Sequence, residues 1–144
     1  MPGTLLPGIL VGIGVAGTAD EVVLHQILRW HHFYDRSTPA AGLVTDGLFH
    51  VFATGALALG LVLLWRRGRL LRSRLLVGAI LAGAGGFNVF DGTVIHKVLR
   101  FHQVREGVAS EVPYDAVFLT VSGALLLAGL ALLRGGRRRA SAAS

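Results

Sequence analysis

The chain contains no cysteine, and its one methionine is the first residue. The absence of cysteine excludes disulfides, thiolate metal sites, iron–sulfur ligation and cysteine nucleophiles. Any metal ion would therefore be held by histidine, carboxylate or other oxygen ligands. Charged residues are also scarce, at 15%, whereas a soluble domain averages about 25%. With 53% hydrophobic residues in 144, this composition predicts a single membrane domain rather than a soluble enzyme or a disordered chain.

Four long apolar runs account for this composition. We expect membrane spans at about residues 5–30, 45–66, 75–101 and 113–134, because a span needs about 20 mostly apolar residues. The first and third spans reach that length only by including polar residues. Residues 1–19 also resemble a signal peptide, but no Lys or Arg precedes the apolar run, which favours a retained span. The sequence thus predicts an all-α transmembrane four-helix bundle.

The arginines predict how the chain crosses the membrane. Five lie between the second and third spans, and four lie at the end of the fourth span and in the basic tail 135–144. They are Arg66, Arg67, Arg69, Arg72 and Arg74, and Arg134, Arg137, Arg138 and Arg139. Because Lys and Arg accumulate on the cytoplasmic side, we expect a multi-pass protein of a bacterial inner membrane with both termini in the cytoplasm. The net charge of +6 is then a topology signal facing the lipid bilayer, and no nucleic-acid partner is expected.

An internal repeat relates residues 20–31 to residues 91–102 without gaps. Both segments read Asp-x4-His-x3-Arg-aromatic-His, and residues 45–50 align with 114–119 in the same way. The repeating unit is therefore a helical hairpin used in tandem, and we expect a pseudo-two-fold axis along the membrane normal to relate the two hairpins. Glycines in the first and third spans predict close helix packing. One of these stretches, 12–17, matches a dinucleotide-binding string, but no strand precedes it.

Histidines and carboxylates gather in the half of the spans that is predicted to face outward. The candidate metal ligands are His25, His50 and His96 with nearby His31 or His102, and Asp20, Glu21, Asp46 and Asp91 as ligands or supporting carboxylates. Neutral imidazole and carboxylate are ligands of zinc, copper(II) and non-haem iron. At a rise of 1.5 Å per residue, His25 and His96 should lie roughly 9 Å deeper than His31 and His102, which predicts two levels of imidazole.

Each of these residues also has a structural interpretation. Asp46 and Asp115 lie where helices begin and would cap them, and His31 and His102 lie where a cationic side chain favours a helix C-terminus. A purely structural Asp–His network is an alternative for the remainder. Ionisable side chains inside an apolar layer are costly unless paired. This cost favours ligation for the deeper residues His25, His50, His96, Asp20, Glu21 and Asp91.

The motif strings resemble those of a known family. Asp-Glu-x3-His-Gln-Ile-Leu-x-Trp-His-His, Asp-Gly-Leu-Phe-His and Phe-Asn-x-Phe-Asp-Gly-x3-His-x5-His are similar to a bacterial family of small four-span membrane proteins described only as a domain of unknown function. The resemblance covers about residues 3–133 and implies no activity, so it assigns no catalytic residue. It does imply an association with assembly factors of haem–copper oxidases, which suits a copper role.

The leading prediction is an integral membrane metalloprotein with a mono- or dinuclear site. Copper is the first choice, followed by iron or zinc. An open coordination position would make the chain a metal-dependent oxidoreductase, and a closed site would make it a metal carrier or store. One alternative is a haem b electron carrier with His25 and His96 as axial ligands; another is a proton or cation path. A homodimer through the glycine faces is a further expectation.

Overall fold

The computed structural model describes residues 5–66 and 73–141, so Arg67, Arg69 and Arg72 of the predicted cytoplasmic loop lie outside the described residues. The helices are α1 (Leu5–Asp20), α2 (Pro39–Arg66), α3 (Ser73–Phe90) and α4 (Val112–Ser141). The π-helix η2 (Glu21–Ile27) continues α1, and the π-helix η3 (Asp91–Leu99) continues α3. Four helices are long and apolar enough to cross a membrane. The predicted all-α fold with four spans is confirmed.

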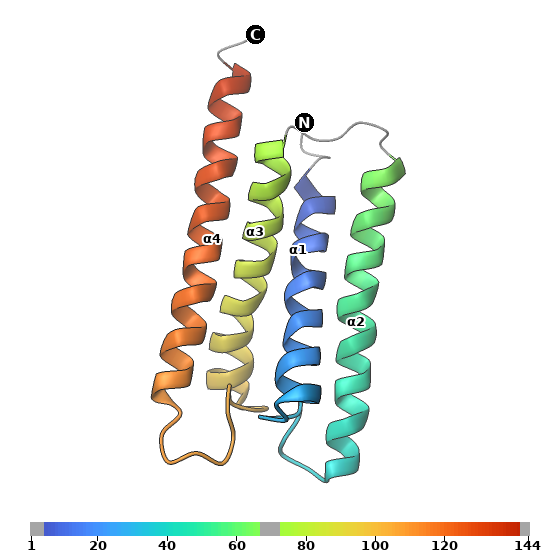
Figure 1. Cartoon of the computed structure of the whole chain (residues 1–144), viewed down its shortest axis with the longest axis vertical. Helices are drawn as coiled ribbons and strands as arrows, with labels where there is room; N and C mark the ends of the chain where they lie inside the picture. Colours follow the sequence, from blue (N-terminus) through green and yellow to red (C-terminus); the bar gives the residue numbers. More distant parts are fainter. Residues whose placement is uncertain (1–4, 67–72, 142–144) are drawn as a thin grey trace.

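The bundle has two central helices, and each outer helix packs against one of them. Helices α1 and α3 pack against each other, α2 packs against α1, and α4 packs against α3. Figure 1 shows the helices in the order α4, α3, α1, α2 across the molecule. Both hairpin loops, 28–38 and 100–111, lie at one end of the bundle, opposite the two termini (Figure 1). We call the end with these loops the histidine end.

Glycine lets the two central helices approach closely. A Cβ atom at Gly12 would collide with the backbone carbonyl oxygen of Ile80, and one at Gly83 with that of Ile9. The two contacts join corresponding positions of the repeat, so each hairpin presents the same small residue to the other. This reciprocity supports the predicted repeat, while the symmetry axis itself stays a prediction.

Two boundaries differ from the expected ones. Helix α2 begins at Pro39, well before the expected start near residue 45, and α4 continues to Ser141 beyond the expected end near residue 134. Proline is well suited to the first position of a helix, where its missing N–H has no partner in any case. The early start of α2 brings its first turns beside the loop that carries His32.

Candidate metal centre

The chain changes its helical form at the point where the polar residues begin. Glu21–Ile27 and Asp91–Leu99 are both π-helices, a rare form with i→i+5 hydrogen bonds that is often found at functional sites. Residues five apart differ by about 140° around an α-helix of 3.6 residues per turn, but they lie one above the other on successive turns of a π-helix. As a result His25 Nε2 lies 3.3 Å from Asp20 Oδ2, and His96 Nε2 lies 2.9 Å from Asp91 Oδ2.

Each π-helix ends with the chain turning back. Arg29 and Arg100, which correspond in the repeat, have left-handed backbone conformations with φ of 51° and 54°. Such a conformation costs a non-glycine residue about 1 kcal/mol, and strain of this kind clusters at functional sites. The reversal returns His31 and His102 to the interior, where both are buried.

The four buried imidazoles form one cluster. The ring centroids of His25 and His31 lie 4.5 Å apart, and those of His96 and His102 also lie 4.5 Å apart. Between these pairs, His31 and His102 stack at 4.4 Å with their planes 6° apart. The prediction of two imidazole levels roughly 9 Å apart is therefore wrong, because the helix does not continue through His31 and His102.

Backbone carbonyls determine the tautomers of the two central rings. His31 Nδ1 lies 2.9 Å from the carbonyl oxygen of Val104, and His102 Nδ1 lies 2.8 Å from that of Phe33. A carbonyl oxygen only accepts, so both Nδ1 atoms carry the proton and each Nε2 presents a lone pair when the ring is neutral. Burial lowers the pKa of His31 to about 2, with the repulsion that would arise between protonated His31 and protonated His102 as a second cause. Burial also lowers the pKa of His102, so both rings are neutral.

The spacing of the polar atoms is that of metal ligands. Within the described residues, the buried Nε2 atoms of all four histidines have no hydrogen-bond partner, although two of them contact carboxylates. Two ligand atoms about 2.1 Å from one ion lie about 3.0 Å apart at a right angle and about 3.4 Å apart in a tetrahedron. The contacts at 3.3 and 2.9 Å from His25 and His96 to their aspartates fit this spacing.

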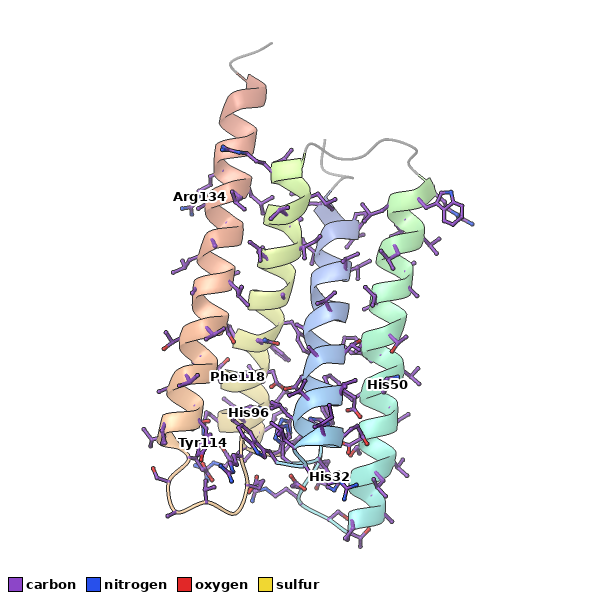
Figure 2. The ribbon with its side chains drawn as sticks, in the orientation of Figure 1. His32, His50, His96, Tyr114, Phe118 and Arg134 are labelled. Carbon is purple, nitrogen blue, oxygen red and sulfur yellow. The ribbon has the colours of Figure 1, made fainter. Side chains whose placement is uncertain are left out.

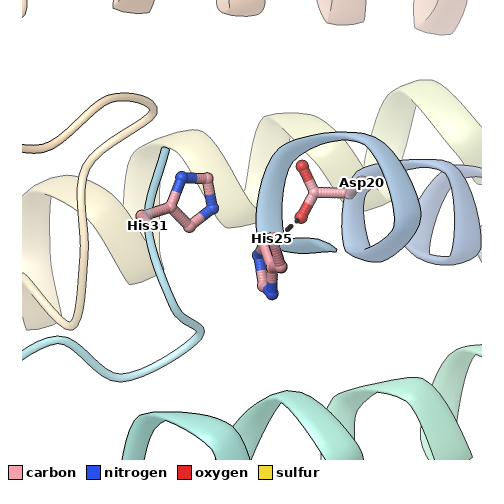
Figure 3. Close-up of side chains that lie close together, drawn as sticks. All are labelled: Asp20, His25 and His31. Atoms are coloured by element: carbon pink, nitrogen blue, oxygen red, sulfur yellow. Dashed lines mark ion pairs between the residues drawn. The ribbon is translucent and has the colours of Figure 1, made fainter. Parts of the chain in front are cut away.

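These residues form two equivalent groups. We call Asp20, His25 and His31 the first triad, and Asp91, His96 and His102 the second triad. The ligand atoms of each triad all lie within 4.8 Å of one another. Figure 3 shows the first triad, in which the η2 helix supplies His25 and the following loop supplies His31. The arrangement therefore fits one cation in each triad.

The first triad has additional carboxylates behind it. His25 Nδ1 lies 2.9 Å from Glu21 Oε2 and 3.0 Å from Asp46 Oδ1. Asp46 also contacts His32 Nδ1 at 2.6 Å and accepts the backbone N–H of Phe33 at 2.7 Å. Glu21 and Asp46 are almost fully buried, at 2% and 1% exposure. They belong to a third group with His25 that has the composition of a metal site.

The second triad lacks this support. Gly92 stands where the first hairpin has Glu21. Asp115, which aligns with Asp46, pairs instead with Lys97 at 2.5 Å. His96 Nδ1 is buried and has no hydrogen-bond partner in the described part of the chain. The two triads therefore have matching ligands, but only the first has further carboxylates in contact with its deeper histidine.

The structure does not bring His50 into the cluster. Asp46, Phe49 and Ala53 lie on the buried stripe of α2, and His50 follows Phe49 by one residue, about 100° around the helix. Its side chain is exposed, and Figure 2 places it on α2, away from His96. Asp46, which precedes His50 by one α-helical turn, contacts His25 and His32 instead.

Sequence reasoning also missed the contacts that orient the cluster. It did not include His32 among the candidate ligands, and it assigned no role to Gln26, which donates to Glu21 Oε1 at 2.8 Å. A signal was present in the spacing, since both Asp–His pairs and the Glu21–Gln26 pair are five residues apart, as one π-helical turn requires. No local signal indicated the carbonyl partners of His31 and His102, which come from the opposite hairpin.

A polar pocket of about 630 Å³ reaches the first triad from the loop side. Its lining includes His25, His31 and His32 together with Asp35 and Glu106. The lining also includes Arg29, so two carboxylates lie against one guanidinium, and the remaining negative charge attracts cations. The first triad is thus accessible to ions from the histidine end of the bundle.

Comparisons with known proteins place the chain in a family without assigning an activity. No curated protein and no solved structure matched it. A family model matches residues 7–136, a range that includes both triads and Glu21 and Asp46. The chain therefore belongs to the family described as "Predicted membrane protein (DUF2243)".

Proposed function

We propose that this chain is an integral membrane metalloprotein that holds one divalent transition-metal ion in each triad. The observation that carries the proposal is the pair of buried Nε2 atoms of His31 and His102, which have no hydrogen-bond partner in the described structure, beside those of His25 and His96, which contact an aspartate. They lie in two groups that each contain a carboxylate at ligand spacing. A purely structural Asp–His network would leave the Nε2 atoms of His31 and His102 unsatisfied, and buried polar groups without partners are costly.

The charges of the cluster support two ions. Asp20, Glu21, Asp46 and Asp91 lie around four imidazoles, and three of these carboxylates are almost fully buried. Buried charge in a low dielectric is stable only when it is compensated. Two divalent cations would balance the four carboxylates, with the histidines acting as neutral ligands.

The donor set favours iron. Two histidines and one carboxylate with open coordination positions are the set typical of non-haem iron(II) sites. Copper and zinc also bind imidazole and carboxylate, but this particular set is less characteristic of them. Iron therefore precedes copper, the first choice from the sequence, and zinc is the third candidate. A bound redox metal would supply one-electron chemistry toward a small molecule. The chain itself positions the ligands: the two carbonyl contacts orient His31 and His102, and Glu21 and Asp46 orient His25.

The two alternatives from the sequence are less well supported. A haem held by His25 and His96 would need the space between them, but the stacked rings of His31 and His102 occupy it. A proton or cation path would need ionisable groups across the membrane, but residues 5–19, 51–65, 75–90 and 116–133 contain none.

We further propose that the arginine-rich end faces the cytoplasm of a bacterial cell, because Lys and Arg are retained on that side. The histidine end then lies at the outer surface of the plasma membrane, where the polar pocket is open to extracytoplasmic ions. The homodimer and the role in assembly of haem–copper oxidases stay predictions from the sequence.

Metal content of the purified protein tests the proposal. The full chain is purified in detergent without oxygen, supplied separately with iron(II), copper and zinc, dialysed, and measured by mass spectrometry of the elements. We expect one ion for each triad in the wild type, and loss of binding in His25→Ala and His96→Ala. His50→Ala is the matched control, since its side chain lies outside the cluster, and it should retain the wild-type content. A folded wild-type chain that retains none of these metals would refute the proposal.

A further inference from the structure

Two buried carboxylates of the first hairpin converge on one nitrogen atom that the first triad does not use. His25 contacts Asp20 of that triad through Nε2. Its other nitrogen, Nδ1, lies 2.9 Å from Glu21 Oε2 and 3.0 Å from Asp46 Oδ1. All three side chains are almost fully buried, and their ligand atoms lie within 4.8 Å of one another. We call Glu21, His25 and Asp46 the Nδ1 group.

The hydrogen bonds of the Nδ1 group leave one carboxylate oxygen without a donor. An imidazole nitrogen carries at most one proton, and His25 Nδ1 donates it to Asp46 Oδ1. The other oxygens of the two carboxylates have partners, because Gln26 donates to Glu21 Oε1 and His32 Nδ1 lies 2.6 Å from Asp46 Oδ2. Glu21 Oε2 is buried and has no hydrogen-bond donor among the described residues. A desolvated carboxylate oxygen in this state is costly, so it calls for a positive ligand.

The second hairpin carries a positive side chain where the first carries none. Lys97 aligns with Gln26 in the repeat, and it pairs with Asp115, which aligns with Asp46. No Lys or Arg in the described part of the chain forms an ion pair with Glu21 or Asp46. The first hairpin therefore has one more carboxylate and one fewer ammonium than the second at this place. Positive charge beside its two carboxylates must come from a histidine or from a bound ion.

The spacing of the Nδ1 group is that of metal ligands, and ions can reach it. Two ligand atoms about 2.1 Å from one ion lie about 3.0 Å apart at a right angle, which matches the contacts of 2.9 and 3.0 Å to His25 Nδ1. Gln26 and His32, which hold the other oxygens of Glu21 and Asp46, line the polar pocket at the histidine end. Two carboxylates and one imidazole leave a fourth position for water, as in open zinc sites.

We propose that the Nδ1 group binds a third divalent transition-metal ion, and that the ring of His25 bridges this ion to the ion of the first triad. The ligands are Glu21 Oε2, Asp46 Oδ1 and His25 Nδ1. When the ion binds, the Nδ1 proton of His25 passes to water, and the resulting imidazolate has one nitrogen on each ion. The inference rests on the proposed function for the ion of the first triad. The third ion binds last and most weakly, because it must displace this proton; until then Glu21 and Asp46 orient His25.

Zinc binding at controlled free concentrations tests the inference. The full chain in detergent carries His50→Ala, which removes an exposed histidine outside the cluster. It is equilibrated with zinc(II) buffered at rising free concentrations, and bound zinc per chain is measured by elemental analysis. We expect a plateau at two ions per chain, followed by a second plateau at three. Glu21→Gln in the same background removes the negative charge of one ligand and should stop at two.

A pair of matched variants at the exposed position of Gln26 tests the role of charge. Gln26→Lys places an ammonium within reach of Glu21, as in the second hairpin, whereas Gln26→Ala removes only the hydrogen bond to Glu21 Oε1. The first variant should stop at two ions, and the second should still bind three.

Three results would overturn the inference and leave the triads in place. They are a wild-type plateau that ends at two ions, a third ion that Glu21→Gln retains, and equal zinc content in the two variants of Gln26. Absence of the two-ion plateau would also overturn it, by removing the ion to which His25 bridges. The failure of the inference and that of the proposed function are therefore distinguishable.

Discussion

Replacing Asp46 with asparagine should weaken the metal site of the first triad without removing a ligand of that triad. Asn keeps the shape of the side chain and one oxygen that can accept a hydrogen bond, but it removes the negative charge. Asp46 lies behind His25, whose Nδ1 donates to Asp46 Oδ1 at 3.0 Å, and it is 1% exposed. The substitution therefore acts on the basicity and orientation of His25, and through His25 on the bound ion.

The structure determines the size of the effect. A carboxylate that supports a ligating histidine contributes 10–100-fold to metal affinity, or about 1.4–2.7 kcal/mol. Glu21 Oε2 lies 2.9 Å from the same Nδ1 atom and can partly replace Asp46. We therefore expect about a tenfold weaker first site in Asp46→Asn, and about a hundredfold in the Glu21→Gln, Asp46→Asn double variant.

Competition with a chromophoric chelator measures both affinities in detergent. Asp115→Asn is the matched control, because Asp115 aligns with Asp46 but pairs with Lys97 and does not contact His96. It should leave both affinities within about twofold of the wild type, the scale of a partly exposed ion pair. An affinity in Asp46→Asn equal to that of a folded wild type, or equal losses in the two variants, would contradict the reasoning.

Three further predictions address packing, protonation and the boundary of the site. Gly12→Ala should destabilise the bundle by about 1–3 kcal/mol, since its Cβ meets the backbone of Ile80, whereas Gly47→Ala has open space around its Cβ and should not; thermal unfolding in detergent compares them. The folded chain keeps the pKa of His31 at about 2, so between about pH 2 and 6.5 the unfolded chain binds more protons, and metal-free protein should unfold at lower temperature at about pH 5 than at about pH 7. Adding His50→Ala to the His25→Ala variant or to the His96→Ala variant should cause no further loss of bound metal, and elemental analysis measures this.

The spans and the membership of the triads could be predicted from the sequence, and the reason lies in the repeat. A hydrophobic run of sufficient length identifies a span by itself. Asp20, His25 and His31 recur as Asp91, His96 and His102, and recurrence in register selects them from the other polar residues. A set of ligand residues that occurs in both hairpins can be recognised in the sequence even when the arrangement of its side chains is not known.

The geometry could not be predicted, because α-helical periodicity does not hold where these residues lie. The π-helices and the left-handed Arg29 and Arg100 change which residues face one another. Each of these features is locally unfavourable, and contacts made elsewhere stabilise it. Two such contacts join the loops of opposite hairpins, from Asp35 N–H to Phe101 O and from Glu106 N–H to Trp30 O, each at 3.0 Å.

The differences between the two halves are more informative about function than their similarity. Glu21 and Asp46 place negative charge behind the first triad, and a polar pocket reaches that triad from the loops. Lys97 pairs with Asp115, the residue that aligns with Asp46, and an apolar cavity is lined in part by Asp91 of the second triad. Equal metal ligands in unequal surroundings should give two ions of different affinity and access. On this reasoning, ions enter through the first triad from the aqueous side.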